Sequence, residues 1–345
     1  MEEQQKVLIP EGHFLDLYNI DREKFKGIGL DWKELTKIHD DYSKRIPSLN
    51  EIGQYLINSI LKTKKVHSVR FRVKDSYHVI EKIIRKKIED PQRQITFDNY
   101  TNEITDLVGV RAIHLFKESW IPIHKYITET FDLHEPPTAY FRKGDESTHL
   151  ESFQEQGCVI KEHPFGYRSI HFIVKSKPEK IEHLTEIQVR TIFEEAWSEI
   201  DHQIRYPYEL DNQILNQFLL IFNRLSGSAD EMGSFIKNLQ LQLKRREVEI
   251  LKQKETIDEL NKKVEQQNIS QEEWTKMRDQ IKSIKIQPLL ANIHPLQSLS
   301  ELIKNDSQGI GLMSSIYPIQ KKFILKSSEK KIEIDEKKNL GKSSD

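Results

Sequence analysis

The spacing of apolar residues changes several times along the first ninety residues of the chain. Between residues 31 and 64 apolar positions recur every three or four residues, which predicts helices interrupted at Pro47. Apolar and polar residues then alternate over 66–73, which predicts a strand, and helical spacing returns over 76–88. Residues 1–30 show no clear period, so we expect an N-terminal extension there.

The middle of the chain mixes predicted strands with predicted helices. The pattern predicts a turn and a buried strand in 104–116, a helix in 120–131, a connection with an edge strand in 132–160, strands in 169–174 and 185–190, and a helix in 191–206. Strands and helices do not alternate strictly. The sequence therefore predicts an α+β fold, in which helices pack on one mixed β-sheet.

Only helical periodicity remains from about residue 215 onward. A seven-residue spacing of apolar positions predicts a coiled coil or helical hairpin, with a long helix lying on the preceding domain as the alternative. The positions are Ile236, Leu239, Leu243, Ile250, Ile257, Leu260 and Val264. We expect a domain at 31–214, an all-α region at 215–305 and a partly disordered tail at 306–345. Residues 230–265 would bind a second copy of the chain or another helix.

Composition restricts the kinds of partner and compartment. The 345 residues include 53 Lys+Arg and 54 Asp+Glu, and this net charge of -1 argues against gross electrostatic binding to nucleic acid or membrane. A single cysteine, Cys158, excludes an intramolecular disulfide and a multi-cysteine metal site. No apolar run approaches the roughly 20 residues that span a bilayer. We expect a cytoplasmic protein with no membrane partner.

Cations alternate along the predicted strand at 66–73 and continue beyond it. Arg70, Arg72 and Lys74 would project from one face, and Lys82 would lie on the following helix. Cations at a strand end and a helix start suit a clamp for phosphate groups. The plainer alternative is a solvated basic face of a strand.

Two acidic residues stand on or beside predicted strands. Asp106 precedes an apolar strand that carries Arg111, and Glu186, Gln188 and Arg190 share one face of a later strand. Carboxylates in such places suit a divalent metal, which for phosphoryl transfer is normally magnesium. The alternatives are a helix or turn cap for Asp106 and a surface ladder of polar residues around Glu186.

An aromatic residue follows a glycine in the segment before the strand at 169–174. Gly166 would let the loop approach a ligand closely, and Tyr167 could stack on a base or serve as a core aromatic. Arg168, the next residue, would be awkward in a core. From the residues alone, the site suits a purine, its phosphates and a divalent metal.

The order of four sequence blocks resembles the synthetase domain of the RelA/SpoT family over about residues 32–210. The blocks are Arg72-x-Lys74 with Lys82, Asp106-Leu-Val-Gly-Val-Arg111, Gly166-Tyr-Arg-Ser-Ile-His171 and Glu186-Ile-Gln-Val-Arg-Thr191. The helix Ala196–Tyr206, with His202, resembles the segment that follows. The resemblance implies a nucleotidyltransferase-like mixed sheet flanked by helices. It also implies transfer of pyrophosphate from ATP to the 3′-hydroxyl of GDP or GTP, which makes the alarmones ppGpp and pppGpp.

The same resemblance implies a role for each matching residue. It implies that Asp106 and Glu186 bind Mg²⁺ and that Glu186 is also a candidate base for the 3′-hydroxyl. The other implied roles are adenine binding by Arg72 and Arg111, ATP-phosphate binding by Lys74 and Lys82, guanine stacking by Tyr167, and contact with the acceptor nucleotide by Arg168 and His171. Further candidates are Arg70, Gln188, Arg190 and His202.

Some positions depart from the family pattern and leave the acceptor open. His78 stands where many relatives have a phosphate-binding Ser, and His163 and Phe165 replace a Lys and an Asn of the acceptor loop. One alternative is a toxin-type relative that modifies the 3′ end of tRNA. Another is a nucleotide-binding regulator that acts through its coiled coil. The pair His39-Asp40 lies too near the start of the synthetase blocks for the family's separate hydrolase domain.

Overall fold

A computed structural model describes residues 7–145, 147–178, 180–205 and 212–266, together with positions 272, 275–276 and 279. The chain divides into two compact units, Met1–Ser234 and Phe235–Asp345. The division falls inside the long helix α9 (Gln213–Gln266), whereas the sequence placed a boundary after residue 214. The beginning of α9 therefore belongs to the unit that contains the sheet.

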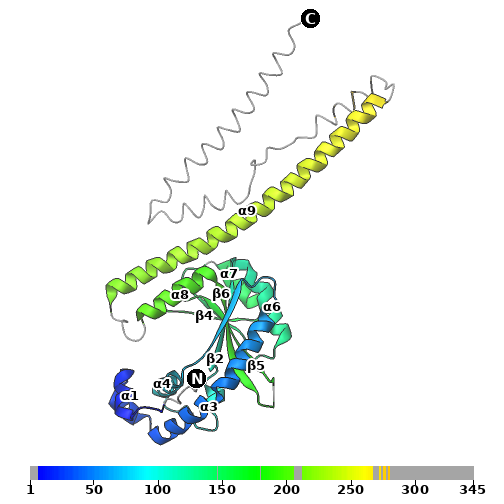
Figure 1. Cartoon of the computed structure of the whole chain (residues 1–345). Helices are drawn as coiled ribbons and strands as arrows, with labels where there is room; N and C mark the ends of the chain where they lie inside the picture. Colours follow the sequence, from blue (N-terminus) through cyan, green and yellow to red (C-terminus); the bar gives the residue numbers. More distant parts are fainter. Residues whose placement is uncertain are drawn as a thin grey trace. The chain divides into compact units, whose positions relative to one another are not determined.

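In the described part of the first unit, six strands form one mixed sheet in the order β1-β2-β6-β5-β3-β4 (Figure 1). Their bounds are β1 Ser68–Val73, β2 Val108–His114, β3 Thr138–Phe141, β4 Val159–Glu162, β5 Ser169–Ser176 and β6 His183–Thr191. The pairs β2–β6 and β3–β4 are parallel, and the other neighbouring pairs are antiparallel. The predicted α+β class with one mixed sheet is confirmed.

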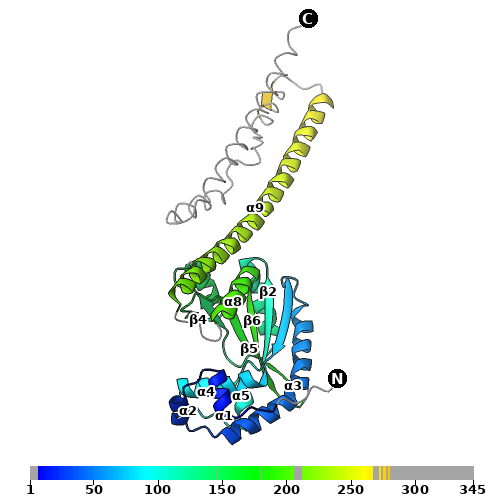
Figure 2. The ribbon, with the colours of Figure 1, turned by 60° about the vertical axis from the view of Figure 1, so that its left-hand side comes forward.

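Helices cover both faces of this sheet, as Figures 1 and 2 show from two directions. Helix α3 (Trp32–Ile60) contacts β1 and β2, and the ring of His124 on α6 (Trp120–Thr130) lies 5.5 Å from that of Phe172 on β5. Helix α8 (Ile192–Arg205) lies against the opposite face, where its carboxylates reach arginines of β1 and β2. The remaining helices are α1 Glu11–Leu17, α2 Arg22–Gly27, α4 Ser76–Glu89, α5 Tyr100–Glu103 and α7 Ser147–Glu155, with a 3₁₀ turn η1 at Lys117–Ser119.

The predicted interruption at Pro47 is wrong, because α3 continues through this residue as one helix of 29 residues. A proline inside a helix removes one hydrogen bond and costs on the order of 3 kcal/mol. The buried stripe of α3 continues on both sides of Pro47, from Leu35 and Tyr42 to Leu56 and Ile60. Burial of this stripe offsets the local cost of the proline.

Residues 7–30 are also folded, although they showed no period in the sequence. Phe14, Leu15 and Phe25 of α1 and α2 are buried in the common core, and the Tyr77 hydroxyl on α4 donates a hydrogen bond of 2.9 Å to the Val7 carbonyl. Helices of six and seven residues make too few turns to establish an apolar period. This part of the chain is therefore an integral layer over α4.

The region 132–160 contains more structure than the single predicted edge strand. It forms β3, α7 and β4, of which β4 lies at the edge of the sheet and β3 lies between β4 and β5. Both strands have four residues, which is too short for alternation to distinguish a strand from a loop. The sheet is consequently wider than the sequence indicated.

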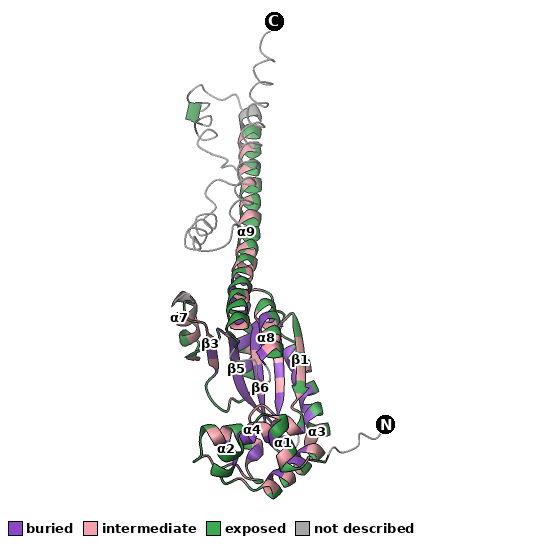
Figure 3. Ribbon diagram, turned by 90° about the vertical axis from the view of Figure 1, so that its left-hand side faces the viewer, coloured by how far each residue is buried: buried purple, intermediate pink, exposed green. Residues whose placement is uncertain are grey.

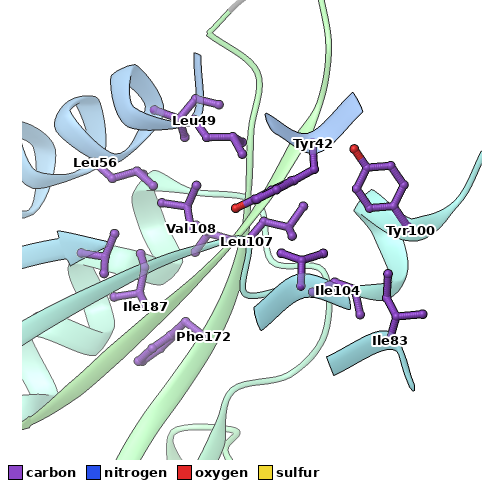
Figure 4. Packing of buried hydrophobic residues seen from close by; sticks show 14 of the residues in the cluster. Tyr42, Leu49, Leu56, Ile83, Tyr100, Ile104, Leu107, Val108, Phe172 and Ile187 are labelled. Carbon is purple, nitrogen blue, oxygen red and sulfur yellow. The ribbon is translucent and has the colours of Figure 1, made fainter. Parts of the chain in front are cut away.

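One face of the sheet is apolar and forms the core of the unit. Figure 3 shows the buried central strands, and Figure 4 shows Val108, Ile187 and Phe172 packed near Leu56 of α3. A Cβ at Gly53 of α3 would lie 2.1 Å from the Phe71 ring on β1, so this helix can approach the sheet only with glycine there. Because side chains alternate along strands, the opposite face receives the polar residues of β1, β2, β5 and β6.

The first part of α9 packs on the same unit through one stripe of side chains. Leu219, Asn223, Ser226 and Asp230 are buried, and the Trp197 indole of α8 donates a hydrogen bond of 3.0 Å to the Leu219 carbonyl. The predicted heptad positions from 236 to 260 lie farther along α9, and their coiled-coil role stays a prediction. The side chain of Val264 and the tail at 306–345 lie outside the described residues. No helix among the described residues is long and apolar enough to cross a membrane.

Asp230→Asn should stabilise the protein at pH 8 more than at pH 5. Burial and the nearby charge of Glu194 raise the pKa of Asp230 to about 7, while an unfolded Asp titrates near 3.9. Between these values the unfolded chain releases a proton that the folded chain keeps, so folding stability falls as the pH rises through this window. The expected gain at pH 8 is on the order of 1–3 kcal/mol.

Thermal unfolding at both pH values measures this effect. Asp258→Asn, at an exposed position of α9, is the matched control and should change neither midpoint. An equal shift for Asp230→Asn at pH 5 and pH 8 would contradict the titration of Asp230.

Candidate functional site

Residues from four neighbouring strands meet on the polar face of the sheet. Arg72 pairs with Gly109 across β1 and β2, and Gly109 pairs with Glu186 across β2 and β6. One step along, Gln188 of β6 pairs with His171 of β5. Paired residues point to the same side of a sheet, so this register joins sequence blocks that are far apart in the chain.

Asp106 lies immediately before β2, between two lysine ammonium groups. Its Oδ2 is 3.0 Å from Nζ of Lys74 and 2.6 Å from Nζ of Lys82. The backbone places these groups, because the Lys74 amide donates to the Leu107 carbonyl at 2.9 Å and the Tyr42 hydroxyl donates to the Lys74 carbonyl at 2.6 Å. The sequence-predicted acid and both predicted phosphate-binding lysines are thus together.

The electrostatic surroundings keep Asp106 ionised. Burial alone would raise the pKa of its carboxyl, but the charges and hydrogen bonds of Lys74 and Lys82 lower it to about 2. The pKa of Lys74 is lowered, chiefly by burial. The Oδ1 atom of Asp106 is buried and has no hydrogen-bond partner among the described residues. This oxygen is an acceptor without a donor inside a positively charged cluster.

A chain of hydrogen bonds links Tyr167, His171 and Glu186. The Tyr167 hydroxyl lies 3.0 Å from Nε2 of His171, and Nδ1 of His171 lies 3.1 Å from Oε1 of Glu186. Gln188 donates to the other oxygen of Glu186 at 2.6 Å. The pattern assigns the proton of His171 to Nδ1, which donates to the carboxylate while Nε2 accepts from the tyrosine.

The same chain controls the charge of Glu186. Burial opposes ionisation, but the interaction and hydrogen bond with His171 outweigh it and lower the pKa of Glu186. The negative charge of Asp106 acts in the opposite direction on this pKa, so the two carboxylates lie within electrostatic reach of each other. Both sequence-predicted acids therefore belong to one cluster.

Two glutamates of α8 hold Arg70 of β1 and Arg111 of β2. Arg70 and Arg111 each contact both Glu195 and Glu199, with distances of 3.2 Å for Arg70–Glu199 and Arg111–Glu195. Burial raises the pKa of Glu199 and the charge of Arg111 lowers it. The net shift of this pKa is downward. Sequence analysis missed both glutamates, although their spacing of four residues places them on one face of a helix.

Arg190 is buried at the centre of the polar face. Its Nη2 donates to Gln188 at 2.8 Å, its Nε lies 2.7 Å from Glu195, and its guanidinium lies 5.5 Å from the centre of the Tyr167 ring. Arg190, itself one of the predicted candidates, therefore contacts Gln188 of β6, the ring of Tyr167 and a glutamate of α8.

Two more predicted residues lie at the rim beside β1. Arg72 is exposed on β1, and burial together with the charge of Arg72 lowers the pKa of His202 on α8. The two side chains are therefore close in space. The proposed partner of Arg72 in adenine binding, Arg111, lies one register step away on β2 and is ion-paired with α8.

Arg168 points away from this cluster. Its Nε and Nη2 donate to the two oxygens of Asp145 at 2.7 and 2.6 Å, which forms a bidentate ion pair. The structure therefore separates Arg168 from the predicted acceptor residues Tyr167 and His171. Asp145 was missed by sequence analysis, and its place in a polar connection gave no signal.

Tyr167 stands among other aromatic rings. Its ring centre is 5.3 Å from that of His163 and 6.0 Å from that of Tyr140 on β3, with both pairs tilted or edge-on. Gly166 has φ +76°, a left-handed backbone conformation that glycine adopts readily. This turn brings Tyr167 back over the polar face after the exposed Phe165. Tyr140 had not been identified from the sequence.

The space above Gly109, on the polar face of the sheet, is open, and we call this position the floor of the site. A Cβ built on this residue would meet no heavy atom within 4 Å, although Arg72 and Glu186 flank it on the neighbouring strands. Glycine weakens a strand and is often found where a ligand approaches the backbone. The bare backbone leaves room for a flat group between the arginine and the acid.

The donor set fits a small, hard divalent cation. Asp106 and Glu186 supply carboxylate oxygens, of which Oδ1 of Asp106 lacks a protein donor in the described structure. No group of three or more His, Cys, Asp or Glu residues that could hold a metal occurs in the described part of the chain. A cation here would take its other ligands from water and from the phosphates of a ligand.

The His39-Asp40 pair has a structural role. His39 is buried, and its Nε2 lies 3.1 Å from the Ser76 hydroxyl at the start of α4. His78, the substituted position of the phosphate block, packs its ring 5.8 Å from that of Tyr18. Neither histidine joins the acidic cluster.

Comparisons with known proteins agree with the sequence blocks. Residues 71–211 match the family model described as "Region found in RelA / SpoT proteins". The chain is similar to the GTP pyrophosphokinase YwaC of Bacillus subtilis (strain 168), with 24% identity over 207 residues, which cover 59% of this chain and 87% of that protein.

Several similar proteins have solved structures. One is the small alarmone synthetase 1 from Bacillus subtilis bound to its product pppGpp, with TM-score 0.43, 19% identity and coverage of 57% of this chain and 97% of that chain. Another is a GTP pyrophosphokinase family protein from Streptococcus pneumoniae, with TM-score 0.42, 22% identity and coverage of 61% and 95%. A likeness at this level says nothing by itself about the reaction.

Gly109→Val should leave the fold intact and weaken nucleotide binding by about 10-fold or more. The new side chain meets open space, and valine suits a strand, so the thermal midpoint should stay the same or rise. The methyl groups would occupy the space between Arg72 and Glu186. Isothermal titration with ATP and a thermal melt measure the two effects.

Gly53→Val is the matched control, because its side chain would collide with the Phe71 ring in the core and should destabilise the protein. Unchanged ATP affinity in a folded Gly109→Val protein would show that the open floor is not the nucleotide site.

Proposed function

We propose that this chain, whose residues 71–211 match the RelA/SpoT family model, transfers pyrophosphate from ATP to the 3′-hydroxyl of GDP or GTP. The bond between the 3′-oxygen and the β-phosphorus forms, the bond between the β-phosphorus and the oxygen of the α-phosphate breaks, and AMP leaves. The products are AMP and a guanosine nucleotide with a 3′-diphosphate. Their assignment extends the activity printed for YwaC to this chain.

The observation that carries the proposal is that two different groups of polar residues, one around Asp106 and one around Glu186, lie on the same face of the sheet. Asp106 has two lysines and an acceptor oxygen with no partner in the described structure, and Glu186 has a hydrogen-bonded histidine that also contacts a tyrosine. Cations suit the phosphates of a donor, whereas a buried acid next to an aromatic loop suits a nucleoside hydroxyl. Together they suit group transfer between two nucleotides.

On the donor side, Lys74 and Lys82 would bind the β- and γ-phosphates. Each would exchange part of its ion pair with Asp106 for contact with the more highly charged triphosphate. Arg72 and Arg111 would hold the adenine from two sides. This requires Arg111 to loosen its contacts with Glu195 and Glu199 when ATP binds.

On the acceptor side, Tyr167 would stack on the guanine and Glu186 would take the proton of the 3′-hydroxyl. Nδ1–H of His171 donates to Glu186 and orients it, and the Tyr167 hydroxyl orients His171 in turn. Gln188 holds the second carboxylate oxygen. Asp106 and Glu186 would bind Mg²⁺, which supplies charge neutralisation of the transferring phosphoryl groups.

Incubation with γ-labelled ATP and one acceptor at a time tests the proposal. Label should move to GDP and GTP in a magnesium-dependent manner and should not move to bulk tRNA. Label on tRNA alone would identify the toxin-type alternative. Absence of label in every acceptor, with ATP still bound, would favour the nucleotide-binding regulator.

Asp106→Asn and Glu186→Gln should each reduce the rate of transfer by about 100-fold or more, because each removes a charge that acts on the transferring group. Initial rates with saturating ATP and GTP measure the effect. Glu51→Gln, at an exposed position of α3, is the matched control and should keep the full rate. Thermal melts check that the slow variants are folded. Near-full activity in either folded variant would remove that residue from the site.

Tyr167→Ala should raise the KM for the acceptor by about 5- to 150-fold, since stacking of a base on an aromatic ring contributes roughly 1–3 kcal/mol. The KM for ATP should change much less. Tyr167→Phe keeps the ring and loses the hydroxyl with its hydrogen bond to His171, so its acceptor KM should stay close to that of the wild type. Equal increases for both substrates in Tyr167→Ala would assign the tyrosine to the donor or to the fold.

A further inference from the structure

One amide of helix α9 holds the loop that carries Tyr167. We call residues 163–168 the aromatic loop. The side chain of Asn223 is buried, and its Nδ2 donates a hydrogen bond of 2.9 Å to the Gly166 carbonyl. Its Oδ1 accepts from Arg142 at 3.3 Å and from Arg168 at 3.2 Å. The amide therefore contacts both the backbone of the loop and two cations beside it.

The surroundings determine the orientation of this amide. A rotated Asn223 would point its NH₂ group at two guanidinium groups and its oxygen at the Gly166 carbonyl, so every contact would become repulsive. The loop backbone also packs closely against Asn223, because a Cβ atom built on Gly166 would lie 3.2 Å from Oδ1 of Asn223. The fit depends on both residue types.

Neighbouring residues of the aromatic loop are also held by other side chains. The Arg205 guanidinium at the end of α8 lies 4.1 Å from the centre of the Phe165 ring, and Arg205 also donates to Asn216 of α9 at 2.7 Å. Arg168 is held by Asp145. Tyr167 is thus the residue between these anchors that turns toward the Glu186 cluster.

We propose that Asn223 is a positioning residue for the acceptor nucleotide, acting through the Gly166 carbonyl on Tyr167. The amide holds the left-handed turn at Gly166, and this turn sets the direction of the Tyr167 ring and its hydrogen bond to His171. The part of the proposal that concerns the acceptor rests on the proposed function. The part that concerns the order of the loop does not.

Three variants separate the contacts. Asn223→Ala removes all of them. Asn223→Asp keeps an acceptor for both arginines, loses the donor to Gly166 and places a carboxylate against the carbonyl. Asn238→Ala, at an exposed position of the same helix, is the matched control. Loss of a buried hydrogen bond that leaves its partner unsatisfied should loosen the loop by about 5- to 150-fold.

Hydrogen exchange measured by mass spectrometry tests the order of the loop without any substrate. Peptides that cover 163–168 should exchange faster in Asn223→Ala and Asn223→Asp, while peptides of β6 keep the wild-type rate. Asn238→Ala should match the wild type throughout. Unchanged exchange of 163–168 in a folded Asn223 variant would overturn the proposal. If Asn223→Ala does not fold, Asn223→Asp decides the question.

Steady-state kinetics with ATP and GTP test the role in acceptor binding. Both Asn223 variants should raise the KM for GTP about 5-fold or more and change the KM for ATP less than about 2-fold. A merely structural role would lower kcat or the thermal midpoint with no such split, and that result would overturn the proposal. If the wild type transfers no pyrophosphate, the proposed function fails, and hydrogen exchange alone decides whether Asn223 holds the loop.

Discussion

The site depends on the compensation of charge on a face of the sheet that helices partly cover. Asp106 faces two lysines, Glu186 faces His171, and Arg111 faces glutamates of α8. A charge left alone in such surroundings would cost several kcal/mol, so each strand must bring its residues into register with its neighbours. Under the proposed function, a charged ligand would replace one partner in an existing pair. The charged groups would then be ready for a polyanion, while their present partners compensate them without one.

Alternation along strands was sufficient to predict which polar residues share a face. It grouped Arg70 with Arg72 and Glu186 with Gln188, because these residues are two apart in regular strands. Local patterns could not predict the partners across the sheet, such as Glu199 for Arg111, since these contacts depend on how distant segments pack. The continuity of α3 through Pro47 was missed for the same reason: burial on both sides outweighs a local preference.

The beginning of α9 packs through a polar interface, which a search for apolar periodicity does not detect. Its buried stripe consists of Leu219, Asn223, Ser226 and Asp230, at helical spacing but with one apolar member. The large apolar side chains of this segment, such as Phe218, are exposed. A search for apolar periodicity therefore assigned the segment to a separate helical region. Its real attachment uses hydrogen bonds, which sequence spacing does not reveal.

The order of strands also determines how the two halves of the sheet are joined. β6 lies between β2 and β5 but is the last of the strands in the described part of the chain. Without β6, β1–β2 and β5–β3–β4 would be two half-sheets, each with an unpaired edge. Such edges invite association with other chains. β6 pairs with both edges and places Glu186 next to Gly109. The strand that joins the two halves of the sheet is therefore also the strand that joins the residues of the site.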